Sequence, residues 1–343
     1  MQATLFVPAP FDAIAGGPIY NRAIVAGLRD AGHAVNVVEL SGRHPLPDDV
    51  ARGSALTAWR ALAPGALALI EGECLPAFAG LADELAARGA VGLIHHPTSL
   101  EIGRDGRARA ELRGIEMRLF PVLRRIVVTS DDTAQRLREF GVAAGRVAVV
   151  TPGMLHVPRS TGPALPGCRI LSIGNLLPRK GHDVLLRALA RLRDLDWTLT
   201  IVGGAHDAAT AAMLPALAAE LAIGERVSFA GAVPPTALEP LWAACGLFAL
   251  ATHYEGYGMA VAEALRRGLP VAVTAGGAQA GVVPASAGVI AAPGDHDALS
   301  KAMRRIVYDR AVRLAMADAA WRAAAALPDW PTQVRRFAAA LEL

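Results

Sequence analysis

The chain has 343 residues, of which 53% are hydrophobic, 19% charged and 5% aromatic, and this composition excludes a disordered protein. A chain of this length predicts two domains rather than one. The net charge of +3 is too small to indicate a nucleic-acid-binding protein, and three widely spaced cysteines without a CxxC pair favour buried thiols over a zinc site or a disulfide framework.

The first half of the chain alternates strand-like apolar runs with segments of helical periodicity. Strands are expected at residues 4–7, 34–40, 66–70, 91–94, 126–129 and 147–150. Helices are expected between them, including one through Ile24 and Leu28 and one at residues 131–140. This βαβ pattern predicts a parallel sheet that helices cover on both faces. Residues 1–10 lack the basic start and long apolar stretch of a signal peptide, so we expect a cytoplasmic protein.

A segment rich in proline and glycine separates the two halves of the chain. Residues 151–167 hold four prolines and three glycines, which cannot continue a helix or a central strand. We therefore predict a Rossmann-like domain over residues 1–160 and a second one over residues 167–326. The expected strands of the second domain are residues 169–173, 198–202, 227–230, 247–251, 271–274 and 289–291, and a last helix is expected at residues 330–343.

Two segments bear on contact with membranes. The longest uncharged run, residues 268–294, is interrupted by prolines and glycines, so no transmembrane helix is expected. The segment from Arg104 to Arg125 holds seven arginines against three acidic residues and has helical spacing. A solvated helix face is the simplest explanation of this charge. The alternative is a peripheral surface that docks on an anionic membrane or an acidic acceptor.

The strongest motif runs from His253 to Glu263 (HYEGYGMAVAE), from the end of an apolar strand into an amphipathic helix. Glu255 is expected in the loop above the strand and Glu263 within the helix, so the two carboxylates would serve different parts of one ligand. Gly256 and Gly258 expose backbone N–H groups at a helix N-terminus, which suits a phosphate. Either glutamate alone would be an ordinary helix residue, but ligands of α/β sheets collect beyond the carboxyl ends of the strands, where this loop falls.

A second motif, Gly174-Asn-Leu-Leu-Pro-Arg-Lys-Gly181, also lies after a strand and before a helix. Arg179 and Lys180 stand at the helix start, where each cation costs about 0.3–1 kcal/mol against the helix dipole unless an anion is bound. A bound diphosphate would reverse the sign of that energy. Because GxxxxGK[ST] is absent and no GxGxxG follows the first strand, kinase-like and NAD-binding functions are disfavoured.

Two weaker signals lie in the first half. Gly16-Gly17-Pro18 follows the first strand and opens a helix; paired glycines allow a close backbone approach, although such a loop can also be a plain turn. His95-His96-Pro97 follows the strand at residues 91–94. One of these histidines would position a sugar or bind a metal, and the ordinary alternative is a structural histidine.

Together, the Glu-x7-Glu pair, the Pro-Arg-Lys-Gly turn and the N-terminal double glycine resemble family four of the retaining GT-B glycosyltransferases. The resemblance covers essentially the whole chain and extends to residues 127–131, 149–153 and 330–341. It implies an α/β protein with the GT-B fold, in which two Rossmann-like βαβ domains face a central cleft. It also implies that the last helix returns to the N-terminal domain.

The resemblance further implies a role for each motif residue. Glu255 would hold the sugar hydroxyls of the donor and Glu263 its ribose hydroxyls. Arg179 and Lys180 would bind the diphosphate, and His95 would face the reacting sugar, so the expected catalytic residues are these two cations, Glu255 and His95. The other expected donor-binding residues are Gly16, Gly17, Gly174, Val233, Gly256, Tyr257, Gly258, Met259 and Ala260.

The implied activity is retaining transfer of a hexose-type sugar from a nucleotide diphosphate sugar, with UDP favoured over GDP. The acceptor would be a small molecule, a lipid-linked molecule or a polysaccharide. No Asp-x-Asp pair lies in a metal-binding context, so we expect no metal and no cofactor, and cations with helix N–H groups would stabilise the departing diphosphate. A GT-B nucleotide-sugar epimerase and a non-catalytic nucleotide-sugar-binding paralogue are the alternatives.

The chain departs from the family pattern at two positions. Asn175 stands where the family commonly has an arginine that contacts phosphate, and Gln279 lies near a position that often carries an acidic residue. Arg179 lies in the same turn as Asn175, and it would supply the missing charge.

Overall fold

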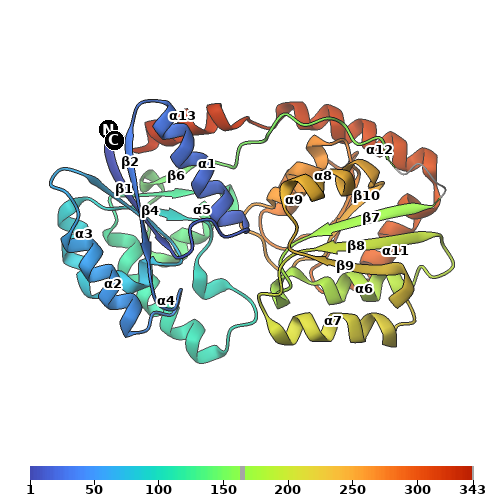
Figure 1. Ribbon diagram of the computed structural model, residues 1–343, viewed down its shortest axis with the longest axis horizontal. Helices are drawn as coiled ribbons and strands as arrows, with labels where there is room; N and C mark the ends of the chain where they lie inside the picture. The colour runs from blue at the N-terminus through green and yellow to red at the C-terminus, as the bar shows by residue number, and fades with distance from the viewer. Residues whose placement is uncertain (163–166, 342–343) are drawn as a thin grey trace. The chain divides into compact units, whose positions relative to one another are not determined.

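The computed structural model describes residues 1–162 and 167–341. Residues 163–166 of the expected linker and residues 342–343 of the expected last helix lie outside the described residues. The chain forms two compact units (Figure 1). Unit 1 comprises Met1–Gly153 together with Asp329–Leu343, and unit 2 comprises Met154–Pro328.

Unit 1 is built on a parallel sheet of six strands in the order β2-β1-β3-β4-β5-β6. The order reverses between β1 and β3, and α/β sheets bind ligands at the carboxyl ends of such neighbouring strands. The strands are β1 (Gln2–Pro8), β2 (Ala34–Leu40), β3 (Leu67–Glu71), β4 (Val91–Ile94), β5 (Arg125–Val128) and β6 (Val147–Val149). The helices between them are α1 (Gly16–Asp30), α2 (Asp49–Arg60), α3 (Ala82–Arg88), α4 (Gly106–Leu119) and α5 (Asp131–Arg136).

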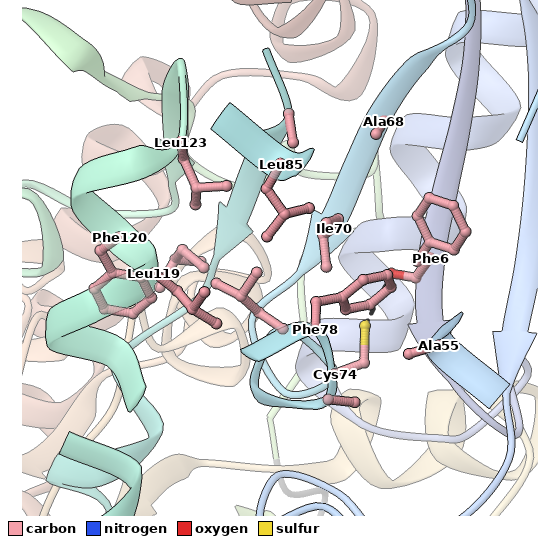
Figure 2. Packing of buried hydrophobic residues seen from close by; sticks show 14 of the residues in the cluster. Phe6, Ala55, Ala68, Ile70, Cys74, Phe78, Leu85, Leu119, Phe120 and Leu123 are labelled. Carbon is pink, nitrogen blue, oxygen red and sulfur yellow. Dashed lines mark hydrogen bonds between the residues drawn. The ribbon is translucent and has the colours of Figure 1, made fainter. Parts of the chain in front are cut away.

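One large hydrophobic cluster of unit 1 includes side chains of β1, β3, β4 and β5. The rings of Phe6 and Phe78 are fully buried and meet edge to face, with centroids 5.5 Å apart. Figure 2 shows Ile70 and Cys74 in the same cluster. Each fully buried side chain of this size contributes about 1.5–3 kcal/mol to folding. Cys74 and the two other cysteines are buried and free, which confirms the prediction from their spacing.

The last helix, α13 (Trp330–Leu341), follows unit 2 in the sequence but packs against α1 of unit 1 (Figure 1). The rings of Tyr20 on α1 and Trp330 lie 5.7 Å apart, and the Tyr20 hydroxyl donates to the carbonyl of Val150 at 2.9 Å. The side-chain amide of Gln333 donates to the carbonyl of Thr151. The sequence predicts a returning helix here, and these contacts fix it to unit 1.

Unit 2 is built on a second parallel sheet of six strands, in the order β12-β11-β10-β7-β8-β9. Here the order reverses between β7 and β10, so the carboxyl ends of these two strands are the expected ligand position. The strands are β7 (Cys168–Ile173), β8 (Trp197–Val202), β9 (Val227–Gly231), β10 (Leu247–Leu250), β11 (Val271–Thr274) and β12 (Gly288–Ala291). The helices are α6 (His182–Ala190), α7 (Ala208–Glu220), α8 (Pro235–Ala244), α9 (Met259–Arg266), α10 (Gln279–Val282), α11 (His296–Tyr308) and α12 (Arg310–Ala323).

Every predicted strand occurs, but two predicted helices are shorter than their sequence pattern. The basic segment from Arg104 to Arg125 is an α-helix only over α4, because Pro121 follows it and Arg125 already belongs to β5. Similarly, α5 ends at Arg136 and a 3-10 turn covers Leu137–Phe140. Among the described residues, no helix is both long enough and apolar enough to cross a bilayer.

Unit 1 ends at Gly153 rather than at residue 160. The amide of Met154 donates to the carbonyl of Pro328 at 2.8 Å, and the amide of Ser160 donates to the carbonyl of Arg267 at 2.8 Å. These bonds attach the first part of the expected linker to unit 2. The prolines of this segment prevent a helix or strand, but the two hydrogen bonds still hold the segment against unit 2.

Candidate functional site

Glu255 lies in the loop after β10, and its backbone is held by the loop after β11. The amide of Glu255 donates to the carbonyl of Gly276 at 3.0 Å, and its own carbonyl accepts from the amide of Ala278 at 2.9 Å. Gly277 has a φ of +72°, and a Cβ atom there would lie 2.2 Å from the carbonyl oxygen of Glu255. Glycine is therefore required at this position, and the backbone beneath the Glu255 side chain is fixed.

The two strongest sequence motifs meet at Glu255. The ammonium of Lys180 contacts Oε1 of Glu255, and Nη1 of Arg179 lies 3.6 Å from the same oxygen. The Arg179 carbonyl accepts from the amide of His253 at 2.8 Å and from the hydroxyl of Thr252 at 2.7 Å. The turn before α6 is thus bound to the loop after β10, and two cations share one carboxylate.

The N-terminus of α9 lies directly after this charge cluster in the sequence. Gly258 has a φ of +98° before the first residue of α9, and a Cβ atom there would lie 2.7 Å from the Cβ of Gln279. Gln279, which lies near the second position that departs from the family pattern, is fully buried. Its side-chain amide donates to the Thr274 carbonyl at 2.7 Å. Gln279 therefore packs against Gly258, and its Cβ atom leaves no room for a side chain at that position.

Glu263 lies on α9 and is partly exposed. Burial raises the pKa of Glu263 to about 7; Arg267 opposes the rise and Glu239 adds to it. Within the described part of the chain, no protein group donates a hydrogen bond to this carboxyl. The oxygens of the Glu263 carboxyl can therefore still accept hydrogen bonds from hydroxyl groups.

Asn175 binds protein at the position where the family pattern has an arginine. Its Oδ1 accepts from the amide of Gly204 at 3.1 Å, and a Cβ atom at Gly203 would lie 2.0 Å from the carbonyl oxygen of Gly174. Nε2 of His182 donates to that carbonyl at 3.0 Å, and burial lowers the pKa of His182 to about 4. The loops after β7 and β8 are thus held together, and the Asn175 side chain is used in doing so.

The remaining expected donor residues of unit 2 lie in loops or in the first turn of α9. Val233 follows β9 and is partly buried against the core, as is Ala260. Burial raises the pKa of Tyr257 to about 12. Gly256, Tyr257 and Met259 are partly exposed between Glu255 and the body of α9.

The two weaker motifs meet in unit 1. A Cβ atom at Gly17 would lie 3.2 Å from Cδ2 of His95, so Gly17 leaves room for the imidazole, and Gly16 precedes it as the first residue of α1. The ring of Tyr20 meets that of His95 edge to face, with centroids 5.3 Å apart. Burial, with a smaller effect of His96, lowers the pKa of His95 to about 3. The His95 ring is therefore neutral at neutral pH.

Three polar residues of unit 1 were not expected from the sequence. Nε2 of His95 lies 3.1 Å from Oδ1 of Asn21 and 3.9 Å from Oε1 of Glu71. Glu116 of α4 is buried and accepts from the Thr98 hydroxyl at 2.8 Å, which fixes the segment after His95. Glu71 alone had a visible signal, since it is a charged residue at the end of an apolar strand. No group of three or more His, Cys, Asp or Glu side chains among the described residues could hold a metal ion.

The arginines of the basic segment are largely used within unit 1. Arg113 stacks over Phe140 with its guanidinium carbon 4.7 Å from the ring centroid, and Arg124 donates to the Leu341 carbonyl at 3.1 Å. Arg104 pairs with Glu101. These contacts reduce the charge available for a partner, and membrane docking of this segment stays a prediction.

The segment that contains the charge cluster is similar to a known protein family. Residues 161–322 match the model of the family described as "Glycosyl transferases group 1". This segment is therefore similar to that family. The match covers the charge cluster of Arg179, Lys180 and Glu255 as well as Glu263, so the matched segment contains every expected donor residue of unit 2.

Curated relatives are glycosyltransferases of bacterial origin. The chain is 31% identical over 261 residues to a D-inositol 3-phosphate glycosyltransferase of Streptosporangium roseum, an alignment that covers 70% of this chain and 60% of the relative. It is 32% identical over 178 residues to a GDP-mannose-dependent alpha-(1-6)-phosphatidylinositol monomannoside mannosyltransferase of Mycolicibacterium smegmatis, which covers 48% of this chain and 45% of the relative. The chain thus spans about half of these relatives' length.

Solved structures resemble the whole chain. Sucrose-phosphate synthase of Thermosynechococcus elongatus has a TM-score of 0.82 at 21% identity, over 99% of this chain and 98% of that one. Anabaena HepE in complex with UDP-glucose has a TM-score of 0.79 at 19% identity, over 99% of both chains. With two parallel six-stranded sheets, the chain has the GT-B fold, which confirms the expected fold class.

Proposed function

We propose that this protein is a retaining, metal-independent glycosyltransferase that moves a hexose-type sugar from a nucleotide diphosphate sugar to a hydroxyl acceptor. The observation that carries the proposal is the charge cluster of Arg179, Lys180 and Glu255. It lies at the carboxyl ends of β7 and β10, where the strand order of unit 2 reverses, and directly before the N-terminus of α9. Two cations with a helix N-terminus form a site for a diphosphate.

Each residue of the cluster has a distinct task in this proposal. Arg179 and Lys180 bind the diphosphate, which releases them from Glu255. The Glu255 carboxylate then accepts hydrogen bonds from sugar hydroxyls, and Glu263 accepts from the ribose. Two comparisons support this class of donor, since one relative is named as GDP-mannose-dependent and the HepE structure is titled as a complex with UDP-glucose. UDP is the nucleotide we favour.

The proposed reaction needs no protein nucleophile. The bond between the anomeric carbon and the diphosphate oxygen breaks through an oxocarbenium-like state, and the acceptor oxygen bonds to the same face of the sugar. The acceptor proton passes to the departing phosphate. Arg179, Lys180 and the N–H groups that open α9 stabilise the negative charge that develops on the diphosphate. His95, a neutral ring, serves as a hydrogen-bonding partner of the sugar rather than as a base.

The location of the reaction belongs to the same proposal. We place it in the cytoplasm, with the segment from Arg104 to Arg125 as the part of unit 1 that would contact an anionic membrane. Arg107 and Arg118 are exposed on α4, and they are the arginines through which such contact would be made.

The test is donor binding without divalent metal. Titration calorimetry with UDP-, GDP-, ADP- and TDP-sugars in EDTA should show selective binding by one of the four. Arg179→Ala should weaken it about tenfold to a hundredfold, the range for loss of a hydrogen bond to a charged group. Arg187→Ala, an exposed arginine on α6, is the matched control and should leave affinity unchanged.

Three outcomes would count against the proposal. Binding by none of the nucleotide sugars would favour a non-catalytic role. Full affinity in Arg179→Ala would show that the cluster does not hold the diphosphate. Release of an epimerised sugar nucleotide in the absence of any acceptor would identify an epimerase instead.

A further inference from the structure

The imidazole of His95 is enclosed on one edge by α1 and by the end of β3. Helix α1 follows β1, and β1 and β3 are the neighbouring strands at which the strand order of unit 1 reverses. Gly17 allows the ring to approach the first turn of α1, with a Cβ atom there 3.3 Å from Nε2. Tyr20 packs edge to face against the ring. The Nε2 atom therefore lies beside protein groups of α1.

Asn21 provides a hydrogen-bond acceptor at that edge. Its side chain is on α1, one turn after Gly17, and the residue is 2% exposed. Oδ1 of Asn21 lies 3.1 Å from Nε2 of His95, which is within hydrogen-bond distance. An amide oxygen accepts and never donates, so this bond requires the proton of the neutral ring to be on Nε2.

Glu71 adds a second oxygen at the same edge. It is 4% exposed at the end of β3, and its Oε1 lies 3.9 Å from Nε2 of His95. Its other oxygen, Oε2, accepts from the amide of Glu73 at 2.8 Å, which fixes the carboxyl. A distance of 3.9 Å is too long for a hydrogen bond, but lone pairs on two sides of Nε2 repel a bare ring nitrogen and favour a protonated one.

We propose that Asn21 and Glu71 are positioning residues that hold His95 in its Nε2–H tautomer, which leaves Nδ1 as a hydrogen-bond acceptor for a hydroxyl of the sugar. The tautomer is argued from unit 1 alone. Its consequence for sugar transfer rests on the proposed function. The tautomer of a histidine is generally set by the bond that its other nitrogen makes, and here that bond is buried and directional.

The tautomer can be measured without any ligand. In the full chain labelled with 15N-histidine, long-range 1H–15N spectra at neutral pH distinguish the protonated from the bare ring nitrogen, and His95→Gln assigns the signals of His95. We expect Nε2–H in the wild type and in Asn21→Asp, whose oxygens also accept. Asn21→Leu, of similar size but unable to accept, should move part of the population to Nδ1–H, and Glu71→Gln should have a smaller effect.

Kinetics give a second readout. In the proposed reaction, Asn21→Leu should lower kcat about three- to tenfold, the effect of one neutral hydrogen bond, while the KM for the donor changes less than about twofold. Asn21→Asp should restore most of the rate. Asn36→Leu, an exposed asparagine on β2, is the control substitution and should change neither readout.

The spectra test the tautomer of His95, and the binding experiment tests the proposed function, so either result can be negative without the other. A wild-type ring protonated on Nδ1, or an Asn21→Leu spectrum identical to the wild type, would overturn the positioning role even if the enzyme transfers sugar. If no nucleotide sugar binds, the proposed function fails, and the spectra still decide the tautomer. Unchanged signals of the other histidines in Asn21→Leu would show that the variant is folded.

Discussion

The carboxyl of Glu263 titrates near neutral pH, because burial raises its pKa to about 7. Ribose hydroxyls donate more strongly to a carboxylate than to a neutral carboxyl. We therefore expect affinity for the nucleotide sugar to rise up to about tenfold between about pH 6 and about pH 8, as the ionised fraction grows. The same ionisation lowers the stability of the ligand-free fold as pH rises from 4.5 to about 7, because the pKa in the folded state lies above the usual value of 4.5.

Glu263→Gln is the control for this pH dependence. It preserves the size of the side chain and removes the titrating proton, so calorimetry should give weaker binding with no rise over the same range. A nucleotide sugar is the right probe, because its diphosphate diester loses no proton near neutral pH. An equal rise in wild type and Glu263→Gln would mean that another group controls binding.

The sequence predicted some site residues better than others for a physical reason. Glu255 and Arg179 follow different strands, and parallel strands bring their carboxyl ends to one edge, so their meeting could be expected from chain order. Asn21 and Glu71 could not be paired with His95 in the same way. That contact depends on which face of α1 points to the sheet and on β3 lying beside β1. No local sequence motif predicts either of these features.

At the scale of elements, strands were easier to place than helix ends. Buried parallel strands are short apolar runs, and all of them were predicted with ends within two residues. The apolar periodicity of a helix can continue in the sequence beyond the residue at which the helix ends. Leu123 and Ile126 continue the apolar spacing of α4. Ile126 nevertheless pairs with Gly92 of β4 as part of β5, so pairing in the sheet overrides the helical pattern.

The contact between α1 and α13 gives a prediction for unit 1. A Cβ atom at Gly27 of α1 would lie 2.4 Å from Cγ2 of Val334 on α13, and Val334 is a stiff, buried side chain. Gly27→Ala should therefore lower the free energy of unfolding by about 1–3 kcal/mol through overpacking. Denaturant titration of the full chain measures this value.

A matched glycine tests the cause. Gly114 of α4 has no neighbouring atom within 4 Å of its Cβ position, so Gly114→Ala should keep or raise stability, as alanine does in an open helix. Adding Val334→Ala to Gly27→Ala should recover part of the loss. Equal stability of Gly27→Ala and Gly114→Ala would show that α13 does not pack on α1 as described.

At the scale of the whole molecule, the two units differ in what their sequence reveals. The family match at residues 161–322 lies within unit 2, which also holds the motifs of the proposed donor site. The βα pattern of both units predicts two parallel sheets, and the GT-B fold of the whole chain was implied by the resemblance of the motifs to a known family. The acceptor could not be predicted, because the loops of unit 1 that would select it carry no recurring motif.

Unit 2 should bind the donor when expressed alone. Residues 154–328 hold their own sheet, their own buried clusters and all the expected donor residues except those of unit 1. A domain of this size with its own core can fold independently. We expect the fragment to bind the nucleotide sugar within about 1.4 kcal/mol of the full chain, as measured by calorimetry. Arg179→Ala in the fragment should lower affinity as in the full chain, and a folded fragment without affinity would contradict the assignment of the donor site to unit 2.

The two points where the chain passes from one unit to the other are adjacent in space. Met154 and Pro328, the ends of unit 2, are joined by a hydrogen bond. On the other side, a Cβ atom at Gly153 would lie 2.5 Å from the Cα of Trp330. Unit 2 is therefore an insertion into unit 1 that enters and leaves at one place. Such an insertion can be replaced as a unit. Under the proposed function, a hybrid that receives the corresponding segment of another GT-B protein is expected to change its donor and keep its acceptor.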